Sequence, residues 1–363
     1  MSDAQIFSRG FRASLTCGAL TLLSAVAQAQ SALPAYNVNP ASASISGISS
    51  GGYMAAQVGI AYSSTFQAGF GVFAAGPFDC ARQQTFSTCM QNHTPEIDAP
   101  NANLKSWNGT ANLDNLSNLA SRKIYMWGGA ADTTVGPNVM NQLHTQLAAY
   151  VNPANVTYIT ADGAAHTFPT NVSDPAKNAC NTAESPYISD CGYDGAGAVL
   201  QWMYGKLSAP NTGALSASVT TFDQTKFVAA GNGMDSVGYL YVPASCAGGQ
   251  NVCKVHVALH GCRQGHAFIN TDFIDKAGYN RWADSNNIIV LYPQAVPDQT
   301  WHQTAGNGSL PNPRGCWDWI GWYGSDFDQK SGVQVKAIAA MVEQITSAYK
   351  GAGGATSPKT ASK

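Results

Sequence analysis

Residues 43–62 read ASISGISSGGYMAAQVGIAY, and this stretch decides the fold that we expect. A short run of small and apolar residues leads into the pentapeptide GISSG at residues 47–51, a G-x-S-x-G motif, and a helical pattern follows. A strand–turn–helix of this kind lifts the central serine above the end of a sheet, and the flanking glycines allow the strained turn and the close packing of the helix. Ser49 is therefore the predicted nucleophile, and its neighbour Ser50 is the rival.

A serine hydroxyl needs a base to take its proton, so we expect a histidine and its orienting acid elsewhere in the chain. In α/β-hydrolases the order is Ser, then Asp or Glu, then His, with the acid and the base on loops that follow strands. Asp132 follows the strand pattern at 123–127, and His166 follows the one at 156–160. We predict that they complete the triad with Ser49, while a helix-capping role is the alternative for the aspartate. Two other histidines are expected to be a surface residue and a packed core residue: His144 and His256.

The oxyanion-hole loop is out of its usual place. In this fold an H-G-G-like motif after a strand normally precedes the nucleophile. Here the match is VHVALHGC at 255–262, far behind Ser49 in the sequence. A circular permutation explains the order, because this strand and the one at 288–292 would replace the missing early strands. The backbone N–H groups of Ser50 and Cys262 are then expected to form the oxyanion hole.

Short apolar runs alternate with helical patterns between residues 30 and 350. The predicted strands are 43–48, 123–127, 156–160, 239–242, 255–259 and 288–292. The predicted helices include 53–62, 137–150, 195–207 and 333–349. This alternation predicts an α/β fold, a single catalytic domain over 30–350 with a mostly parallel central sheet.

The two ends of the chain lack the alternation of strand and helix patterns that the domain shows. Arg9 and Arg12 precede an apolar stretch that ends in Ala27-Gln28-Ala29, which predicts a signal peptide over 1–29. The stretch is too short for a membrane span. Export to the extracellular space follows, with the periplasm as the alternative. Residues 351–363 are small, polar and unpatterned, and we expect a disordered tail.

The net charge and the low content of charged residues exclude some classes of binding partner. The 363-residue chain has a formal net charge of −2, and 11% of its residues are charged, compared with about 25% in soluble domains generally. Nucleic acid is excluded as a partner, because phosphate binding needs a basic surface. No membrane association is expected either, since no other segment is apolar over the length of a span. A polar but weakly charged surface suits a neutral, water-poor partner.

Eight cysteines remain after the predicted signal peptide, and in an exported protein they predict four disulfides. Eight cysteines allow on the order of a hundred connectivities. Three pairs are close in sequence: Cys80 and Cys89, Cys180 and Cys191, Cys246 and Cys253. We expect the remaining Cys262 and Cys316 to be bridged. Neither a CxxC motif nor a histidine at zinc-ligand spacing occurs, so no metal is expected.

Over nearly its whole predicted mature length the chain resembles the single-domain secreted poly(3-hydroxybutyrate) depolymerases of the fungal Penicillium type. The matching stretches are 46–57, 70–82, 122–143, 163–170, 185–198, 238–243, 257–264, 278–284, 291–295 and 312–326. The resemblance implies a circularly permuted α/β-hydrolase, four disulfides and a Ser-His-Asp triad, whose motifs fall on Ser49, His166 and Asp132. It also implies that the Cys262 amide serves the oxyanion hole.

The resemblance further implies that a tryptophan of the CWDW segment lines the substrate cleft. By position we favour Trp319, with Trp317 as the alternative. The implied activity is hydrolysis of poly(3-hydroxybutyrate) and its oligomers through an acyl-enzyme, by a monomer at an insoluble polyester surface and without a cofactor. Two rivals remain: a carboxylesterase for soluble or plant-wall esters such as feruloyl or acetyl groups, and a non-catalytic polymer-binding protein, which the intact triad disfavours.

Overall fold

The computed structural model describes residues 30–171 and 178–351. The predicted signal peptide (1–29) and residues 352–363 of the predicted tail lie outside the described residues. Within them, one large sheet is built from β1 (Ser44–Ile48), β2 (Gly69–Phe73), β3 (Lys123–Gly129), β4 (Val156–Ala161), β8 (Thr220–Asp223), β9 (Val237–Tyr241), β10 (Lys254–Leu259) and β11 (Ile288–Tyr292).

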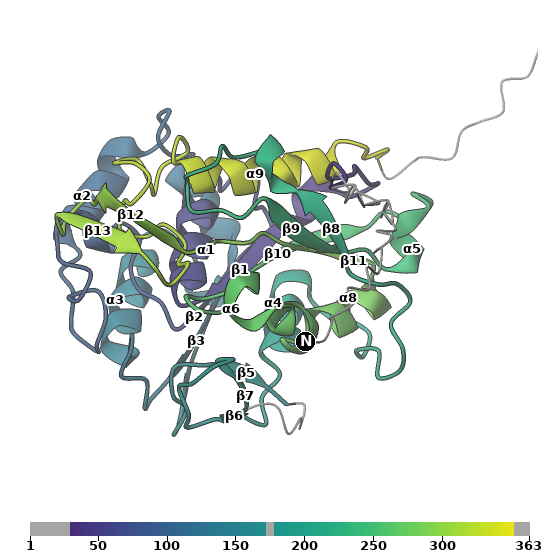
Figure 1. The fold of residues 1–363 in the computed structure, drawn as a ribbon, viewed down its shortest axis with the longest axis horizontal. Helices are drawn as coiled ribbons and strands as arrows, with labels where there is room; N and C mark the ends of the chain where they lie inside the picture. The colour runs from purple at the N-terminus through teal and green to yellow at the C-terminus, as the bar shows by residue number, and fades with distance from the viewer. Residues whose placement is uncertain (1–29, 172–177, 352–363) are drawn as a thin grey trace, which may run out of the picture.

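The order of these strands is β4-β3-β2-β1-β10-β11-β9-β8 (Figure 1). The six strands from β4 to β11 run parallel, and β9 and β8 add an antiparallel edge. β1 pairs on one side with β10, with Ser44 opposite His256. The strand that precedes Ser49 therefore lies beside the strand that precedes His260, as the permuted order predicts.

Helices cover both faces of the sheet, which gives three layers (Figure 1). On one face lie α1 (Ser50–Ala61), α3 (Pro137–Ala148) and α9 (Val333–Thr346), and on the other α4 (Gly195–Tyr204) and α8 (Tyr279–Asn286). Successive strand residues point to opposite faces: Met126 packs with the first group of helices and Trp127 with the second. Both faces are therefore buried along the central strands, whereas β4 at the edge of the sheet is only partly buried.

The predicted strands and helices are all present, with ends that differ by up to three residues. Helix α1 starts at Ser50 instead of Tyr53, because the turn at Ser49 leads straight into the helix. Two strands of the large sheet were not predicted. β2 (GFGVF) contains two glycines and is buried on both faces, so it has no alternating pattern, and β8 is a short edge strand.

Smaller elements surround the sheet. They are α2 (Asp98–Trp107), α5 (Ala244–Ala247), α6 (His266–Ile269), α7 (Asp272–Lys276), β5 (Phe168–Thr170), β6 (Asn178–Ala179), β7 (Ile188–Asp190) and the hairpin of β12 (Asp298–Gln303) with β13 (Ser309–Asn312). None of the helices in the described ranges is both apolar and long enough to cross a bilayer.

The four predicted disulfides are confirmed: Cys80–Cys89, Cys180–Cys191, Cys246–Cys253 and Cys262–Cys316. The last closes the longest loop, 54 residues, and joins the segment after β10 to the segment after β13. It thereby ties together two regions that the sheet alone does not connect.

The two histidines expected to be structural also lie as predicted. His144 is exposed on α3. His256 is fully buried between the hydroxyl groups of Ser44 and Ser46, which lie 2.7 and 2.8 Å from its ring nitrogens. Burial lowers the pKa of His256 to about 3, so the ring stays neutral and links β10 to β1.

Candidate active site

Ser49 occupies a strained turn between β1 and α1. Its φ of 56° and ψ of −124° lie in a region that residues with a side chain rarely adopt. The backbone N–H of Ser49 donates to the carbonyl of Phe73 at 2.9 Å, which holds the turn against the end of β2. A β-carbon on Gly51 would lie 2.4 Å from the carbonyl oxygen of His260. The glycine of the motif is thus required because another backbone passes that close.

Asp132 and His166 lie in hydrogen-bond contact behind this turn. Asp132 comes from the loop after β3 and His166 from the loop after β4, and Nδ1 of His166 donates to Oδ2 of Asp132 at 2.8 Å. The other carboxylate oxygen accepts the N–H groups of Thr134 at 2.8 Å and Val135 at 3.0 Å. With Nδ1 engaged in this way, Nε2 of His166 is left to accept a proton.

The environment keeps Asp132 ionised. Burial raises the pKa of Asp132, but the neighbouring imidazole of His166 and the two amides outweigh it and hold the pKa below its ordinary value. A carboxylate is therefore available to orient the imidazole and to stabilise it when it is charged. The alternative of a helix-capping aspartate is wrong, because the N-cap of α3 is Gly136 without a side-chain cap, and Asp132 instead bonds to Thr134 and Val135 of its own loop.

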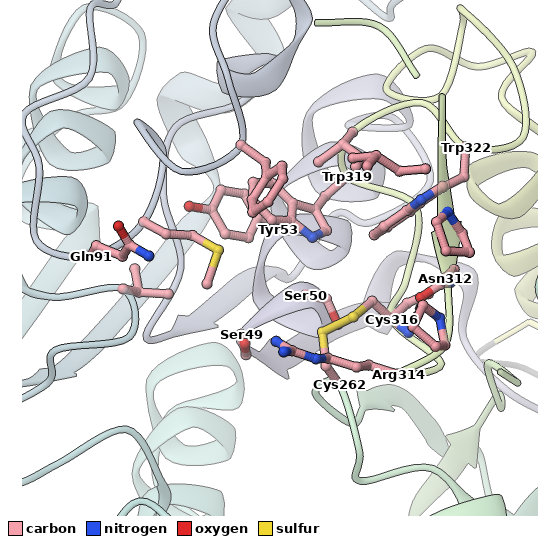
Figure 2. Close-up of a pocket in the computed structure, with 17 residues that line it drawn as sticks. Ser49, Ser50, Tyr53, Gln91, Cys262, Asn312, Arg314, Cys316, Trp319 and Trp322 are labelled. Atoms are coloured by element: carbon pink, nitrogen blue, oxygen red, sulfur yellow. Dashed lines mark hydrogen bonds between the residues drawn. A yellow bond between two sulfur atoms is a disulfide. The ribbon is translucent and has the colours of Figure 1, made fainter. Parts of the chain in front are cut away.

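Ser49 borders two cavities. The first has a volume of about 460 Å³, and its wall is mainly apolar (Figure 2). Its aromatic side chains are Tyr53, Phe86, Trp319 and Trp322. The second has a volume of about 240 Å³ and includes the polar side chains of Thr134, His166, Arg263 and Gln264. Four residues line both cavities: Ser49, Met90, Cys262 and Arg314. Ser49 and His166 thus share one cavity, and Ser49 also faces an apolar one.

The loop after β10 lies against Ser49. A β-carbon on Gly261 would be 3.2 Å from Cβ of Ser49, so the loop passes in contact with the nucleophile position. The side chain of Gln264 accepts the Gly261 N–H at 2.7 Å and thereby fixes the loop. Ser50 and Cys262 both line the first cavity beside Ser49. Their role as oxyanion donors stays a prediction, which this proximity supports.

His260 braces the same loop from inside. Its Nδ1 donates to the carbonyl of Gly261 at 2.8 Å, and its Nε2 accepts the N–H of Ala295 at 3.1 Å. Burial lowers the pKa of His260 to about 4, so the ring is neutral. A neutral ring with one donor and one acceptor nitrogen satisfies both contacts, and it holds the loop in one position.

The structure separates the two tryptophans of the CWDW segment. Trp319 lines the first cavity and stacks on Tyr53, with ring centroids 4.4 Å apart (Figure 2). Trp317 is fully buried, and its indole N–H donates to the carbonyl of His260 at 2.9 Å. Of the two, Trp319 is therefore the one placed to touch a ligand, while Trp317 supports the loop that carries Cys262.

Sequence reasoning missed several residues of this region. Arg263 and Arg314 line the cavities beside Ser49, and Asp318 holds the segment that carries Trp319. The arginines had a signal, because each stands within two residues of a cysteine of the long bridge in a chain with few charges. Asp318 had none, since its partners are backbone amides. Across 30–171 and 178–351, His, Cys, Asp and Glu side chains form no group of three that could hold a metal ion.

Comparison with known proteins places the chain among hydrolases. A sequence model of the prolyl oligopeptidase family (Peptidase_S9) matches residues 21–180. A polyhydroxybutyrate depolymerase of Talaromyces funiculosus is 58% identical over 92% of this chain and 97% of its own length. A poly(3-hydroxybutyrate) depolymerase of Delftia acidovorans is 40% identical over 90% of this chain, which corresponds to 63% of that relative.

Solved structures agree with the sequence comparison. The crystal structure of a PHB depolymerase from Penicillium funiculosum has a TM-score of 0.86 and 58% identity, and the match covers 88% of this chain and all of the other. A serine-to-alanine variant of a PHB depolymerase, complexed with an R3HB trimer, gives the same values.

Proposed function

The chain belongs to the polyhydroxybutyrate depolymerase family and is a serine ester hydrolase, and on that basis we propose that it cleaves poly(3-hydroxybutyrate) and its oligomers with Ser49, His166 and Asp132 as a catalytic triad. The observation that carries the proposal is the hydrogen bond between His166 and Asp132 at the wall of a cavity that Ser49 also lines. The trimer complex of the related variant supports the same substrate class.

In the acylation step, Oγ of Ser49 attacks the ester carbonyl while Nε2 of His166 accepts the hydroxyl proton. Asp132 stabilises the imidazolium that forms, which its ionised state allows. The negative charge on the carbonyl oxygen is to be held by the backbone N–H groups of Ser50 and Cys262. Loss of one such donor typically removes about 2.7–4 kcal/mol of transition-state stabilisation.

The intermediate then collapses, the C–O bond of the ester breaks, and the leaving alkoxide takes its proton from His166. The acyl group remains on Ser49 as a 3-hydroxyacyl ester. A water molecule, deprotonated by the same His166, attacks this ester and releases a hydroxy acid, and the Ser49 hydroxyl is restored. Every proton that moves is supplied or accepted by the triad or by water.

We also propose the setting in which the enzyme acts. The signal pattern at 1–29 and four disulfides support export, because disulfides persist in oxidising compartments. The weakly charged composition supports contact with an insoluble, uncharged polyester surface. We propose a monomer as the active form, because one chain carries the whole triad.

The test of the triad is Ser49→Ala, with hydrolysis of a hydroxybutyrate trimer and of a p-nitrophenyl ester as readouts. We expect kcat to fall by a factor of about 10⁶, as removal of a triad member does in other serine hydrolases. The circular dichroism spectrum and thermal midpoint should stay those of the parent. Near-parental turnover by Ser49→Ala would mean that Ser49 is not the nucleophile and would favour Ser50. Ser50→Ala is therefore the paired variant.

The rival substrates need a separate comparison. We would incubate the parent enzyme with a poly(3-hydroxybutyrate) film and, separately, with a feruloylated xylan. This assay distinguishes a depolymerase from a plant-wall carboxylesterase. We expect soluble hydroxy acids from the film. Release of ferulate from the xylan with an untouched film would refute the proposal, and binding to the film without any product would favour the non-catalytic rival.

A further inference from the structure

Two arginines stand at the entrance to the candidate active site. Arg314 lines both cavities that Ser49 borders, and Arg263 lines the second. The backbone N–H of Arg263 donates to the carbonyl of Arg314 at 2.8 Å, and the Cys262–Cys316 bridge joins the two segments, so the two arginines are held as a pair. In Figure 2 the side chain of Arg314 extends below this bridge towards Ser49.

The charges of this pair are not balanced nearby. Among the described residues, neither cavity wall contains an aspartate or a glutamate. Over the same part of the chain, the ion pairs and side-chain hydrogen bonds include none from the guanidinium of Arg263 or Arg314, and both residues are exposed. Arg82, in contrast, is paired with Asp79 and with Asp328. Two exposed, unpaired guanidinium groups on segments that the Cys262–Cys316 bridge joins fit an anion, and their planar donor fork fits a carboxylate in particular.

We propose that Arg314 and Arg263 bind the free carboxylate at the end of a hydroxybutyrate chain, so that the enzyme prefers to cleave the ester near that end. The proposal rests on the proposed function, and it names the form of substrate that this site selects. A polyester chain carries one carboxylate, at its acid end, and every other repeat unit is neutral. A carboxylate anchor therefore distinguishes chain ends from chain interiors.

The positions of the cavities give the direction of the bound chain. His166 must protonate the leaving alkoxide, and this alkoxide belongs to the part of the chain that runs to the carboxylate end. His166 lies in the second cavity together with both arginines. The acyl part of the chain, which ends in a hydroxyl group, would then bind in the first cavity, against the apolar wall of Tyr53 and Trp319.

The bonds balance without a further reactant. The scissile C–O bond breaks, the acyl carbon becomes bonded to Oγ of Ser49, and the alkoxide oxygen takes the proton that His166 holds. The departing product is a short 3-hydroxybutyrate unit that already carries its own carboxylate, and Arg314 and Arg263 release it by exchange with solvent. Water then removes the acyl group as in the general reaction.

The test compares a hydroxybutyrate trimer as the free acid with the same trimer as its methyl ester, at low ionic strength. We expect the parent enzyme to favour the free acid by about tenfold in kcat/KM, which corresponds to about 1.4 kcal/mol for a charge-assisted contact. Arg314→Ala should bring the ratio of the two kcat/KM values closer to one, because only Arg263 then remains beside the carboxylate. Arg314→Lys should keep part of the preference, because the charge remains and the fork is lost.

The matched control is Lys336→Ala, which removes one positive charge from the exposed side of α9, at a residue that lines neither cavity. Its ratio should equal that of the parent. Because the ratio is measured on one preparation, a partly folded variant lowers both rates and leaves the ratio intact. Salt should lower the preference of the parent more than that of Arg314→Ala.

The outcomes are separable. Equal rates for the free acid and the methyl ester in the parent overturn the anchoring proposal, and so does an undiminished preference in Arg314→Ala. In either case cleavage of both trimers leaves the proposed function standing. A parent enzyme that cleaves neither trimer overturns the proposed function and the anchor with it.

Discussion

Two buried aspartates support segments of the candidate active site, and they differ in that only Asp132 has a histidine as a neighbour. Asp132 stands behind His166, and Asp318 lies under the segment that carries Trp319. Each is almost fully buried, with 3% and 2% of its surface exposed. Each also receives backbone N–H groups, from Thr134 and Val135 in the first case, and from Gly321, Trp322 and Tyr323 in the second.

Their pKa values nevertheless move in opposite directions. Burial raises the pKa of Asp318 to about 6, although its amides oppose the rise. Burial also raises the pKa of Asp132, but there the imidazole of His166 joins the amides, and the pKa falls below its ordinary value. Amide hydrogen bonds alone thus do not offset the loss of hydration at this depth, whereas a nearby group that becomes cationic does. Asp132 is thus the carboxylate that we propose for the chemistry, and Asp318 holds a wall of the cavity.

Of the substitutions that distinguish Asp132 from Asp318, Asp132→Asn is expected to have the largest effect on turnover. The amide cannot hold the imidazole in its productive tautomer, so kcat should fall by a factor of about 10⁴. Asp318→Asn is the matched control, since it removes the same charge from a site of equal depth, and it should cost much less turnover. Steady-state hydrolysis of a soluble trimer measures both. Comparable losses would refute the assignment of the two roles.

The two aspartates are also expected to affect the pH dependence of the unfolding free energy, in opposite directions. Asp318 has a folded pKa of about 6, above the unfolded value of about 3.9. Between these values the folded state holds a proton that the unfolded state has lost, so stability falls as pH rises from 4 to 6. The shift corresponds to about 3 kcal/mol. Asp132 acts oppositely: its lowered pKa contributes stability above pH 4, which is lost as pH falls through the folded pKa.

Urea unfolding at a series of pH values checks this prediction. The unfolding free energy of the parent minus that of Asp318→Asn should fall by about 3 kcal/mol from pH 4 to pH 7. The same difference for Asp132→Asn should be nearly constant over that interval and should fall below pH 4, as Asp132 becomes protonated in the folded state. A pH-independent difference for Asp318→Asn would mean that its carboxyl group has the same pKa in the folded and unfolded states.

The smallest effects concern the tryptophan above Asp318. Trp319→Ala should lower turnover of soluble hydroxybutyrate trimers by about tenfold, because it removes one apolar wall contact in the first cavity. Adsorption to a polymer film should hardly change, since we expect the film to be bound by the outer surface. Depletion from solution by film, measured for Ser49→Ala and for Ser49→Ala/Trp319→Ala, tests this. A double variant that no longer adsorbs, with normal trimer cleavage by Trp319→Ala, would refute the placement.

Much of this site could be predicted from local sequence. The position of Ser49 follows from a motif in which short-range backbone geometry is decisive, and the loops of Asp132 and His166 follow from their places behind strands. The pairs of close cysteines needed only short loop closures, and the fourth pair followed by elimination. β2 was not predicted, because burial on both faces removes the alternation and its two glycines offset the strand propensity of Phe70, Val72 and Phe73.

The sequence by itself therefore determined the chain order of the proposed triad residues, the permuted arrangement of β1 and β10, and the four disulfides, because each depends on local turns, strand patterns or counting. Only the tertiary structure decided which tryptophan faces the cavity, that two arginines remain unpaired beside Ser49, and that Asp132 and Asp318 differ in pKa. These properties depend on burial and on neighbours brought in from distant segments. Desolvation and Coulomb interactions act through space, and no pattern along the chain records them.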